Sequence, residues 1–360
     1  MGFFAMKNIF KVVFVIIGTL IGAGFASGQE MYLFFFSYGI EGLIGIVVSC
    51  ILMGLIIYKA LCLIDKYNIK TYKEFLEMFI KPKQNESFFN LKNIVNIVIN
   101  IFILVTFFIM IAGFGAYFEQ ELGINSLIGS IILASFCFFI FMTSIKGVVK
   151  ASEILVPILI IFVVIIGFMN IVEINLPELD KYIIRTNTSS YLLSAIIYCS
   201  YNSILLLPVL ITLKDYLSSK KQIASIAAIS TVISIALSVI IFLLLVRVDV
   251  DISNLEMPAV YVVSHMFKIL KIAYGFIILG SIFTTAISLG TSYLQNVSKS
   301  KKSYTQIAIF MCITSVLVSK IGFSNLINSL YPIFGYLGII QILLIIFKKN
   351  PKLKTINKKE

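Results

Sequence analysis

The sequence has 360 residues, of which 59% are hydrophobic and only 13% charged, and its mean hydropathy is +1.03. A water-soluble core of this size could not bury so many apolar side chains, so the composition excludes a soluble globular protein and indicates an integral membrane protein. The formal charge of +12 does not indicate nucleic-acid binding, because the basic residues are spread over many short loops and form no patch interleaved with aromatic residues.

Apolar segments recur from end to end of the chain, and a window of about 20 residues per crossing predicts ten transmembrane helices. They lie near residues 11–38, 43–64, 94–118, 126–145, 152–172, 189–213, 222–246, 271–297, 304–320 and 325–347. The joins are short except for a charged segment at 65–93, a polar one at 173–188, and an amphipathic stretch at 249–270 expected on the membrane surface. Residues 1–347 are predicted to form one transporter domain, and residues 348–360 a basic tail that touches anionic lipid.

Basic residues favour one side of this predicted bundle. If the N-terminus is inside, only six of the 29 Lys and Arg residues lie outside, namely Lys181, Arg185, Arg247, Lys268, Lys271 and Lys320. Because cytoplasmic loops carry the positive excess, we predict a multi-pass protein of the cell membrane with both termini cytoplasmic.

Ten helices divide into two halves of five, approximately residues 11–172 and 189–347, and an odd number per half inverts the second half. Inverted repeats are typical of secondary transporters, in which the first helix of each half is broken near the membrane midplane. In the first half, the stretch GTLIGAGFASGQE (18–30) places Gly22 about 16 Å into a hydrocarbon layer about 30 Å thick. In the second half, the run YCSYNS (198–203), followed by Pro208, predicts a break in the sixth helix, although no glycine is present.

The predicted break in the first helix indicates a binding site. Unwound carbonyl groups suit a cation and free N–H groups suit a carboxylate, while glycine lets a solute approach the backbone. The residues expected to contact the solute are Gly22, Ala23, Gly24, Phe25 and Ser27. The alternative is close helix packing, because Gly18 with Gly22, and Gly24 with Gly28, each form GxxxG. Packing alone does not require the polar residues that follow.

The run IGAGFASGQE (Ile21 to Glu30), followed by the aromatic stretch Tyr32 to Phe36 and Gly39, resembles the N-terminal signature of the YkvI-like bacterial membrane proteins. More distantly, it resembles the first helix of the amino acid–polyamine–organocation superfamily, whose LeuT-type fold is a five-plus-five inverted repeat. The resemblance implies an all-α membrane transporter with discontinuous helices one and six that moves an amino acid or a related small organic solute.

The eighth predicted helix carries hydroxyl groups on one face, at Ser281, Thr284, Thr285, Ser288 and Ser292. In sodium-coupled LeuT-type transporters, this helix supplies a carbonyl group and, three and four residues later, two hydroxyl groups to a sodium ion. The resemblance therefore implies an ion site made by Ser281, Thr284 and Thr285 with the carbonyl groups of Gly18 and Ile21. The alternative is that the hydroxyl groups bond their own helix backbone, as they often do in membranes.

Glu30 is the one carboxylate predicted to lie deep in the hydrocarbon region, where an unpaired charge is unfavourable. Three roles are open: a charge that binds a substrate amine, a proton carrier, and part of an outer gate. Its position two helical turns beyond the break favours the gate or the proton site. A structural carboxylate bonded to Gln29 or to a neighbouring hydroxyl group is the remaining alternative.

Several other residues are weaker candidates. Tyr201, Asn202 and Ser203 in helix six could hydrogen-bond the solute, and Phe107 and Phe108 in helix three could cover it, but ordinary packing accounts for them equally well. His265 is interpreted as an interfacial residue. The five cysteines lack metal-ligand spacing and are interpreted as small apolar residues, so neither a disulfide framework nor a zinc site is expected.

Together these features predict a secondary active transporter in which sodium drives uptake of a small zwitterionic solute by alternating access. A proton-coupled transporter that uses Glu30 and an uncoupled facilitator or channel are the alternatives. An enzyme or sensor is disfavoured because no nucleophile, base and metal cluster together in the sequence. No cofactor is expected beyond Na⁺ or H⁺, and the expected partners are the solute and membrane lipid, without nucleic acid; no oligomeric state is predicted.

Overall fold

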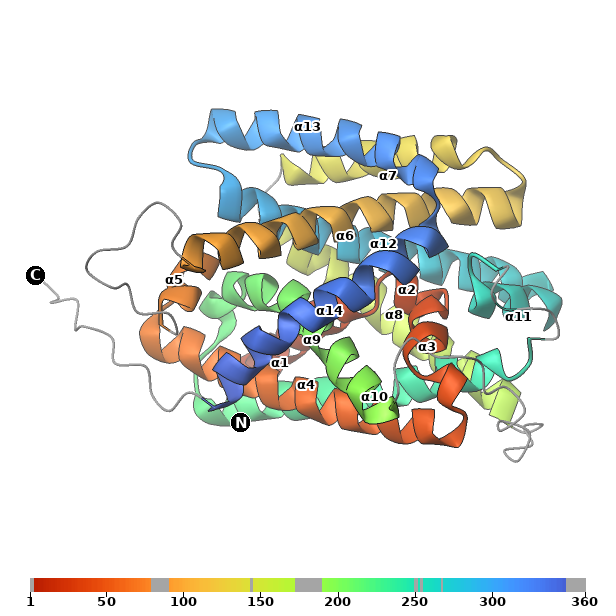
Figure 1. The fold of residues 1–360 in the computed structure, drawn as a ribbon, viewed down its shortest axis with the longest axis horizontal. Coiled ribbons are helices and arrows are strands. Elements are labelled where there is room, and N and C mark those ends of the chain that lie inside the picture. The colour runs from red at the N-terminus through yellow and green to blue at the C-terminus, as the bar shows by residue number, and fades with distance from the viewer. Residues whose placement is uncertain are drawn as a thin grey trace, which may run out of the picture.

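The computed structural model describes residues 3–78, 91–142, 145–171, 190–248, 252, 255–266 and 268–347, and these residues form helices joined by short connections (Figure 1). The α-helices are α1 (Phe3–Leu20), α2 (Ala23–Ala26), α3 (Gln29–Phe34), α4 (Ile40–Tyr67), α5 (Tyr72–Glu77), α6 (Leu91–Leu122), α7 (Ser126–Phe141), α8 (Ile145–Ile171), α9 (Tyr191–Thr212), α10 (Lys220–Leu245), α11 (Pro258–Met266), α12 (Lys268–Val297), α13 (Lys301–Val318) and α14 (Phe323–Phe347). The predicted polar loop at 173–188 and the basic tail at 348–360 lie outside the described residues.

The helices have the length and composition of membrane-spanning elements. Among the described residues, seven helices are long and apolar enough to cross a membrane, and two shorter apolar helices lie at Ser126–Phe141 and Val156–Met169. Large apolar side chains also face outward, since Phe139, Phe168 and Phe310 are 68 to 76% exposed. Such a surface suits lipid and not water.

The helices surround the first apolar segment. α1 packs against α8, α10 and α12, while α9 packs against α4 and α14. α12 in turn packs against α6 and α8, and α7 and α13 lie together along one side of the bundle (Figure 1). The N-terminal segment is thus held between several long helices.

The first apolar segment is interrupted twice, and each interruption falls at a glycine. α1 ends at Leu20, and Gly22 takes an extended conformation (φ −88°, ψ −166°) before the four-residue helix α2. Gly28 then adopts a left-handed conformation (φ +85°) and α3 begins. The predicted break in the first helix is therefore confirmed, and a short helical turn separates its two interruptions.

The predicted break in the sixth helix is wrong, because α9 is continuous through the run YCSYNS. The polar side chains of this run bond their own helix: Ser200 Oγ donates to Ile196 O at 2.6 Å, Asn202 Nδ2 to Tyr198 O at 3.1 Å, and Ser203 Oγ to Ser200 O at 2.8 Å. The run contains no glycine, and unwinding would leave backbone groups unpaired in an apolar interior. The helix also accommodates Pro208.

The amphipathic stretch at 249–270, predicted to lie on the membrane surface, packs against the helical bundle through α11. Its helix α11 buries the side chains of Ala259, Val260, Val262 and Val263 against the bundle. The N–H of Ala259 donates to Ser27 O at 2.8 Å, which joins this stretch directly to the interrupted first segment.

At the opposite end of the bundle, Tyr72 joins α5 to α14. Its hydroxyl group is buried and donates to Gln341 Oε1 at 2.6 Å. Burial raises the pKa of Tyr72 well above its ordinary value, so the hydroxyl group stays protonated and keeps donating.

We expect Gly28→Ala to destabilise the protein by about 2–4 kcal/mol. Gly28 has a left-handed conformation, which is unfavourable for a residue with a Cβ. The new Cβ would also lie 2.9 Å from Leu245 Cδ2 and 3.2 Å from the Ala259 nitrogen, so overpacking adds to the conformational strain. Thermal unfolding of the purified protein in detergent measures the effect.

Gly123→Ala is the matched control, because Gly123 also has a positive φ (+65°) but nothing lies within 4 Å of the position that its Cβ would take. It should lose only the conformational contribution of about 1–2 kcal/mol. Equal losses in the two variants would contradict the proposed packing role of Gly28.

Candidate functional site

The interruption after α1 frees backbone carbonyl groups from the helical ladder. The last bond of the ladder runs from the Ile21 N–H to Ile17 O at 2.8 Å, and the Ala23 N–H, two residues further on, points to Met110 Sδ at 3.3 Å. The carbonyl oxygen of Gly18 instead accepts a hydrogen bond from Thr285 Oγ1 at 2.6 Å, and that of Ile21 is 3.4 Å from the same hydroxyl group. The end of α1 and the middle of α12 therefore meet where carbonyl groups without a helical partner face the Thr285 hydroxyl group.

The other residues of the predicted ion site lie within one turn of Thr285 on α12. Thr284 Oγ1 donates to Ser281 O at 3.0 Å, and all three α12 side chains are at most 2% exposed. Among the described residues, no group of three or more His, Cys, Asp or Glu lies together. The oxygens of Gly18, Ile21 and Thr285 that meet here are neutral, and neutral oxygens suit a hard monovalent cation.

Glu30 is buried beside the break. Its side chain is 3% exposed, and Tyr201 Oη donates to its Oε2 at 2.5 Å. A Cβ added to Gly24 would lie only 2.5 Å from Glu30 Oε1, so the carboxylate rests against the backbone of α2. The left-handed turn at Gly28 folds α3 back toward α2, which the count of helical turns along a straight helix did not anticipate.

Aromatic rings from several helices surround the Glu30–Tyr201 pair. The Tyr201 ring stacks between Phe34 and Tyr331, with centroid distances of 5.4 and 4.6 Å, and the Tyr198 ring meets it edge-on at 5.4 Å. The Phe102 ring of α6 lies edge-on to Tyr201 and Tyr331, with centroid distances of 6.5 and 6.4 Å. Sequence reasoning selected only Tyr201 of this group. The i, i+3 spacing of Tyr198 and Tyr201 was a usable signal, whereas nothing in the sequence pointed to Phe102 or Tyr331.

The predicted aromatic cover on α6 packs against other rings. Phe107 packs against Phe108 and against Phe141 of α7, at centroid distances of 6.3 and 5.9 Å. Two other α6 residues lie against the break: Met110 Sδ would lie 3.2 Å from a Cβ on Gly22, and a Cβ on Gly113 would lie 2.9 Å from Ala23 Cβ. Asn202 bonds its own helix but also lines a small cavity beside Ile21 and Phe25, whereas no contact from Ser203 to the break is observed in the described structure.

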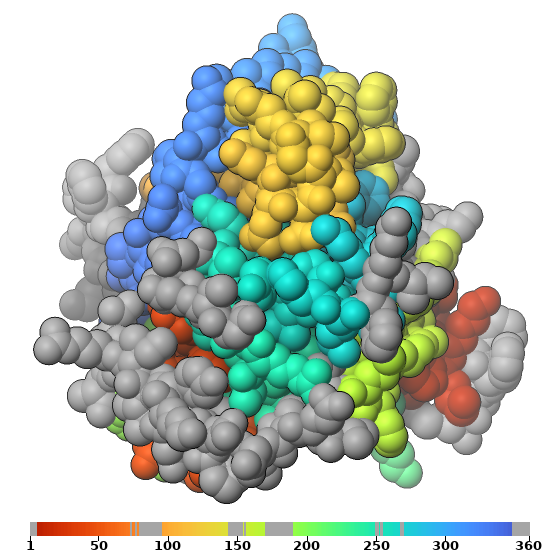
Figure 2. All heavy atoms as spheres, turned by 90° about the vertical axis from the view of Figure 1, so that its right-hand side faces the viewer, coloured from red at the N-terminus to blue at the C-terminus, as the bar shows by residue number. Residues whose placement is uncertain are grey.

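Residues 255–259, which we call the cover segment, close one end of the site. Gln29 Nε2 donates to Leu255 O at 2.5 Å, and the Ala259 N–H donates to Ser27 O. From α12, Tyr274 Oη donates to Ala26 O at 2.7 Å. In the space-filling view of this end, α11 and the start of α12 lie over the middle of the face (Figure 2).

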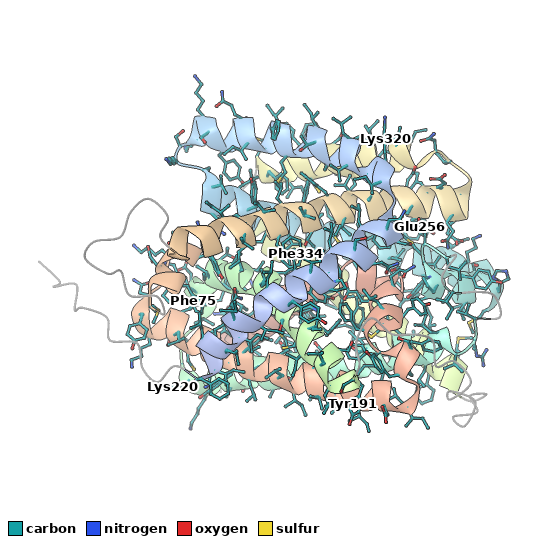
Figure 3. The ribbon with its side chains drawn as sticks, in the orientation of Figure 1. Phe75, Tyr191, Lys220, Glu256, Lys320 and Phe334 are labelled. Carbon is teal, nitrogen blue, oxygen red and sulfur yellow. The ribbon has the colours of Figure 1, made fainter. Side chains whose placement is uncertain are left out.

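Glu256 connects the cover segment to the start of α14 (Figure 3). Its Oε2 accepts hydrogen bonds from the N–H and the hydroxyl group of Ser324, at 2.7 and 2.6 Å. The Ser324 N–H is one of the first N–H groups of α14 and has no partner within the helix, so Glu256 caps α14 from another segment. The sequence contained no signal for this contact, because the two residues are 68 positions apart.

No protein-family model matches the sequence. The chain is 30% identical over 352 residues to the uncharacterized membrane protein YkvI of Bacillus subtilis (strain 168), covering 96% of this chain and 97% of that protein. It is also 25% identical over 339 residues to the uncharacterized protein YyaD of the same organism, covering 91% and 93%.

Solved transporter structures share the fold at low sequence identity. MhsT in complex with L-phenylalanine matches with a TM-score of 0.69 and 16% identity, covering 93% of this chain and 88% of MhsT. A Na⁺-coupled sialic acid symporter matches with a TM-score of 0.62 and 14% identity, covering 94% and 79%. Mhp1, a nucleobase-cation-symport-1 family transporter, gives the same TM-score and identity, covering 94% and 77%. The chain is an all-helical membrane protein with the LeuT-type fold.

We expect Glu256→Ala to lower stability by about 1–2 kcal/mol, because the start of α14 loses a cap and the Ser324 N–H loses its partner. Thermal unfolding measures the loss. Glu119→Ala is the control, because Glu119 is an exposed carboxylate near the end of α6. A loss no larger than that of Glu119→Ala would contradict the capping role.

Proposed function

Because the chain belongs to the same family as the Bacillus subtilis membrane protein YkvI and has the fold of known solute transporters, we propose that it is a secondary active transporter of a small organic solute. The observation that carries the proposal is the contact at the first break, where the carbonyl oxygens of Gly18 and Ile21 face Thr285. An interrupted helix in the middle of a membrane bundle leaves backbone groups free to bind ions and solute.

We propose that the helices make ten crossings in two inverted halves, approximately residues 11–172 and 189–347, with both termini cytoplasmic. The interruption of the first apolar segment supports this arrangement. The continuous α9 departs from the expected pair of broken helices, so backbone groups for binding would come from the first half alone.

The coupling ion is proposed to be sodium, held by the carbonyl oxygens of Gly18, Ile21 and Ser281 and the hydroxyl oxygens of Thr284 and Thr285. A bound ion would supply the positive charge that links α1 to α12. In the structure, Thr285 Oγ1 donates its proton to Gly18 O, whereas toward a cation the same oxygen would present a lone pair. The hydroxyl group can therefore satisfy the Gly18 carbonyl group when no ion is bound.

The solute is proposed to be an amino acid or a related zwitterion that binds beside α2, near Gly22, Ala23, Gly24, Phe25 and Ser27. A Cβ at position 22 would press against Met110 Sδ and Thr285 Cγ2, each at 3.2 Å, so glycine keeps the backbone close to its neighbours here. Tyr201 of α9 reaches this region through its hydrogen bond to Glu30.

If sodium is the coupling ion, replacing potassium by sodium at constant ionic strength should raise the melting temperature of the purified protein. A ligand at 100 times its dissociation constant stabilises by about 2.7 kcal/mol. The double variant Thr284→Ala with Thr285→Ala should lose this sodium response. Thr314→Ala on α13 should keep it, because Thr314 bonds its own helix at Phe310 O. A sodium response that survives in the double variant would refute the proposed ligand set.

Proton coupling and uncoupled facilitation are the two alternatives to sodium coupling, and uptake into proteoliposomes distinguishes the three. Proton coupling predicts uptake that follows an inward proton gradient without sodium and is lost in Glu30→Gln, because the amide cannot carry a proton. A facilitator predicts uptake that no ion gradient drives above equilibrium. Sodium coupling predicts accumulation that requires an inward sodium gradient and is unaffected by collapsing the proton gradient.

A further inference from the structure

Glu30 has no counter-charge in the part of the chain that the structure describes. Its partners there are the hydroxyl groups of Tyr201 and Tyr198, whereas the ion pair observed elsewhere joins Lys271 to Glu121. A carboxylate at 3% exposure inside a membrane bundle is unfavourable unless it is neutralised or meets a positive charge. Either protonation of Glu30 or the arrival of a positive group would remove this unfavourable charge.

The position of this carboxylate decides which end of a solute it can accept. Glu30 Oε1 lies against the α2 backbone, so close that a Cβ on Gly24 would be 2.5 Å away and would also meet Glu30 Cγ at 2.9 Å. A carboxylate group of a solute brought to this backbone would face a like charge at short range. An ammonium group would face an opposite charge, and its N–H groups could take the place of the Tyr201 hydroxyl group on Oε2.

The aromatic rings around Glu30 suit the same group. Tyr201 is stacked between Phe34 and Tyr331, and Tyr198 lies edge-on to both Tyr201 and Phe34, at 5.4 and 5.5 Å. Because Phe34 and Tyr331 cover the two faces of Tyr201, the rings would pack around the carbon atoms attached to the nitrogen and exclude water from the charged pair. Three separate elements, α3, α9 and α14, supply these rings, so the arrangement depends on the closed bundle.

We infer that Glu30, with the rings of Phe34, Tyr198 and Tyr201, forms an ammonium-binding subsite, and that the preferred solute is an organic amine without a carboxylate group. This inference rests on the proposed transport function and changes its proposed solute class from a zwitterion to an organic cation. Glu30 then acts as the residue that selects substrate charge.

Matched solutes that differ only in their charged groups test this inference. For each carbon skeleton, the amine, the parent amino acid and the acid without the α-amino group are compared: phenethylamine, phenylalanine and 3-phenylpropionate; isopentylamine, leucine and 4-methylpentanoate; cadaverine, lysine and 6-aminohexanoate. Binding to the purified full-length protein is measured by thermal stabilisation and by calorimetry in sodium buffer. The expected result is that at least one amine binds about tenfold or more tightly than its parent amino acid, and that the two acids lacking an amino group do not bind.

Variants assign the preference to Glu30. Glu30→Gln should weaken amine binding by about tenfold or more and abolish the difference between amine and amino acid, while Glu30→Asp should restore part of it. Tyr201→Phe keeps the ring and should keep the amine preference, whereas Tyr201→Leu should reduce amine affinity several-fold. Glu41→Gln, an exposed carboxylate at the start of α4, is the control and should bind as the parent protein does.

The outcomes separate this inference from the transport proposal. An amino acid that binds more tightly than its amine, or a folded Glu30→Gln variant that keeps the amine preference, overturns the ammonium subsite and leaves the transporter standing. A sodium response without binding of any amine also overturns the subsite alone. If neither ions nor any solute of the panel stabilises the protein or enters proteoliposomes, both proposals fall.

Discussion

The requirement that every backbone polar group in a membrane interior find a partner explains most of the arrangement around the first apolar segment. Interrupting this segment at Gly22 and Gly28 removes the helical partners of several carbonyl groups. Side chains and backbone from distant parts of the chain replace them: Thr285 at Gly18, Tyr274 at Ala26, and the Ala259 N–H at Ser27. The placement of α12 and α11 thus follows from the carbonyl groups that the break leaves free.

The same requirement explains why α9 stays intact although its middle is polar. Ser200, Asn202 and Ser203 direct their hydrogen bonds to carbonyl groups of their own helix, so they add no need for an external partner. A glycine can leave the helix without a side chain to bury, whereas a serine or asparagine can satisfy itself within it. Polarity alone is therefore a poor indicator of a broken helix, and glycine together with polarity is a better one.

The site combines two features of different origin. The architecture shared with the solved transporters places α1 beside α12, where the carbonyl groups of Gly18 and Ile21 face Thr285. The buried carboxylate and its aromatic surroundings belong to this chain's own side chains. Glu30 places a carboxyl group in contact with α2, and the fold alone does not dictate this residue.

The sequence by itself determined the membrane setting, the break in the first helix and the hydroxyl face of the eighth, because hydropathy, glycine placement and helical spacing are local properties. Tertiary structure alone decided where Glu30 points, that Met110 and Gly113 of α6 lie against the break, and that Glu256 caps α14. These depend on the left-handed turn at Gly28 and on contacts between residues tens to hundreds of positions apart. No local pattern encodes such contacts, because they form only when the packed helices bring the two surfaces together.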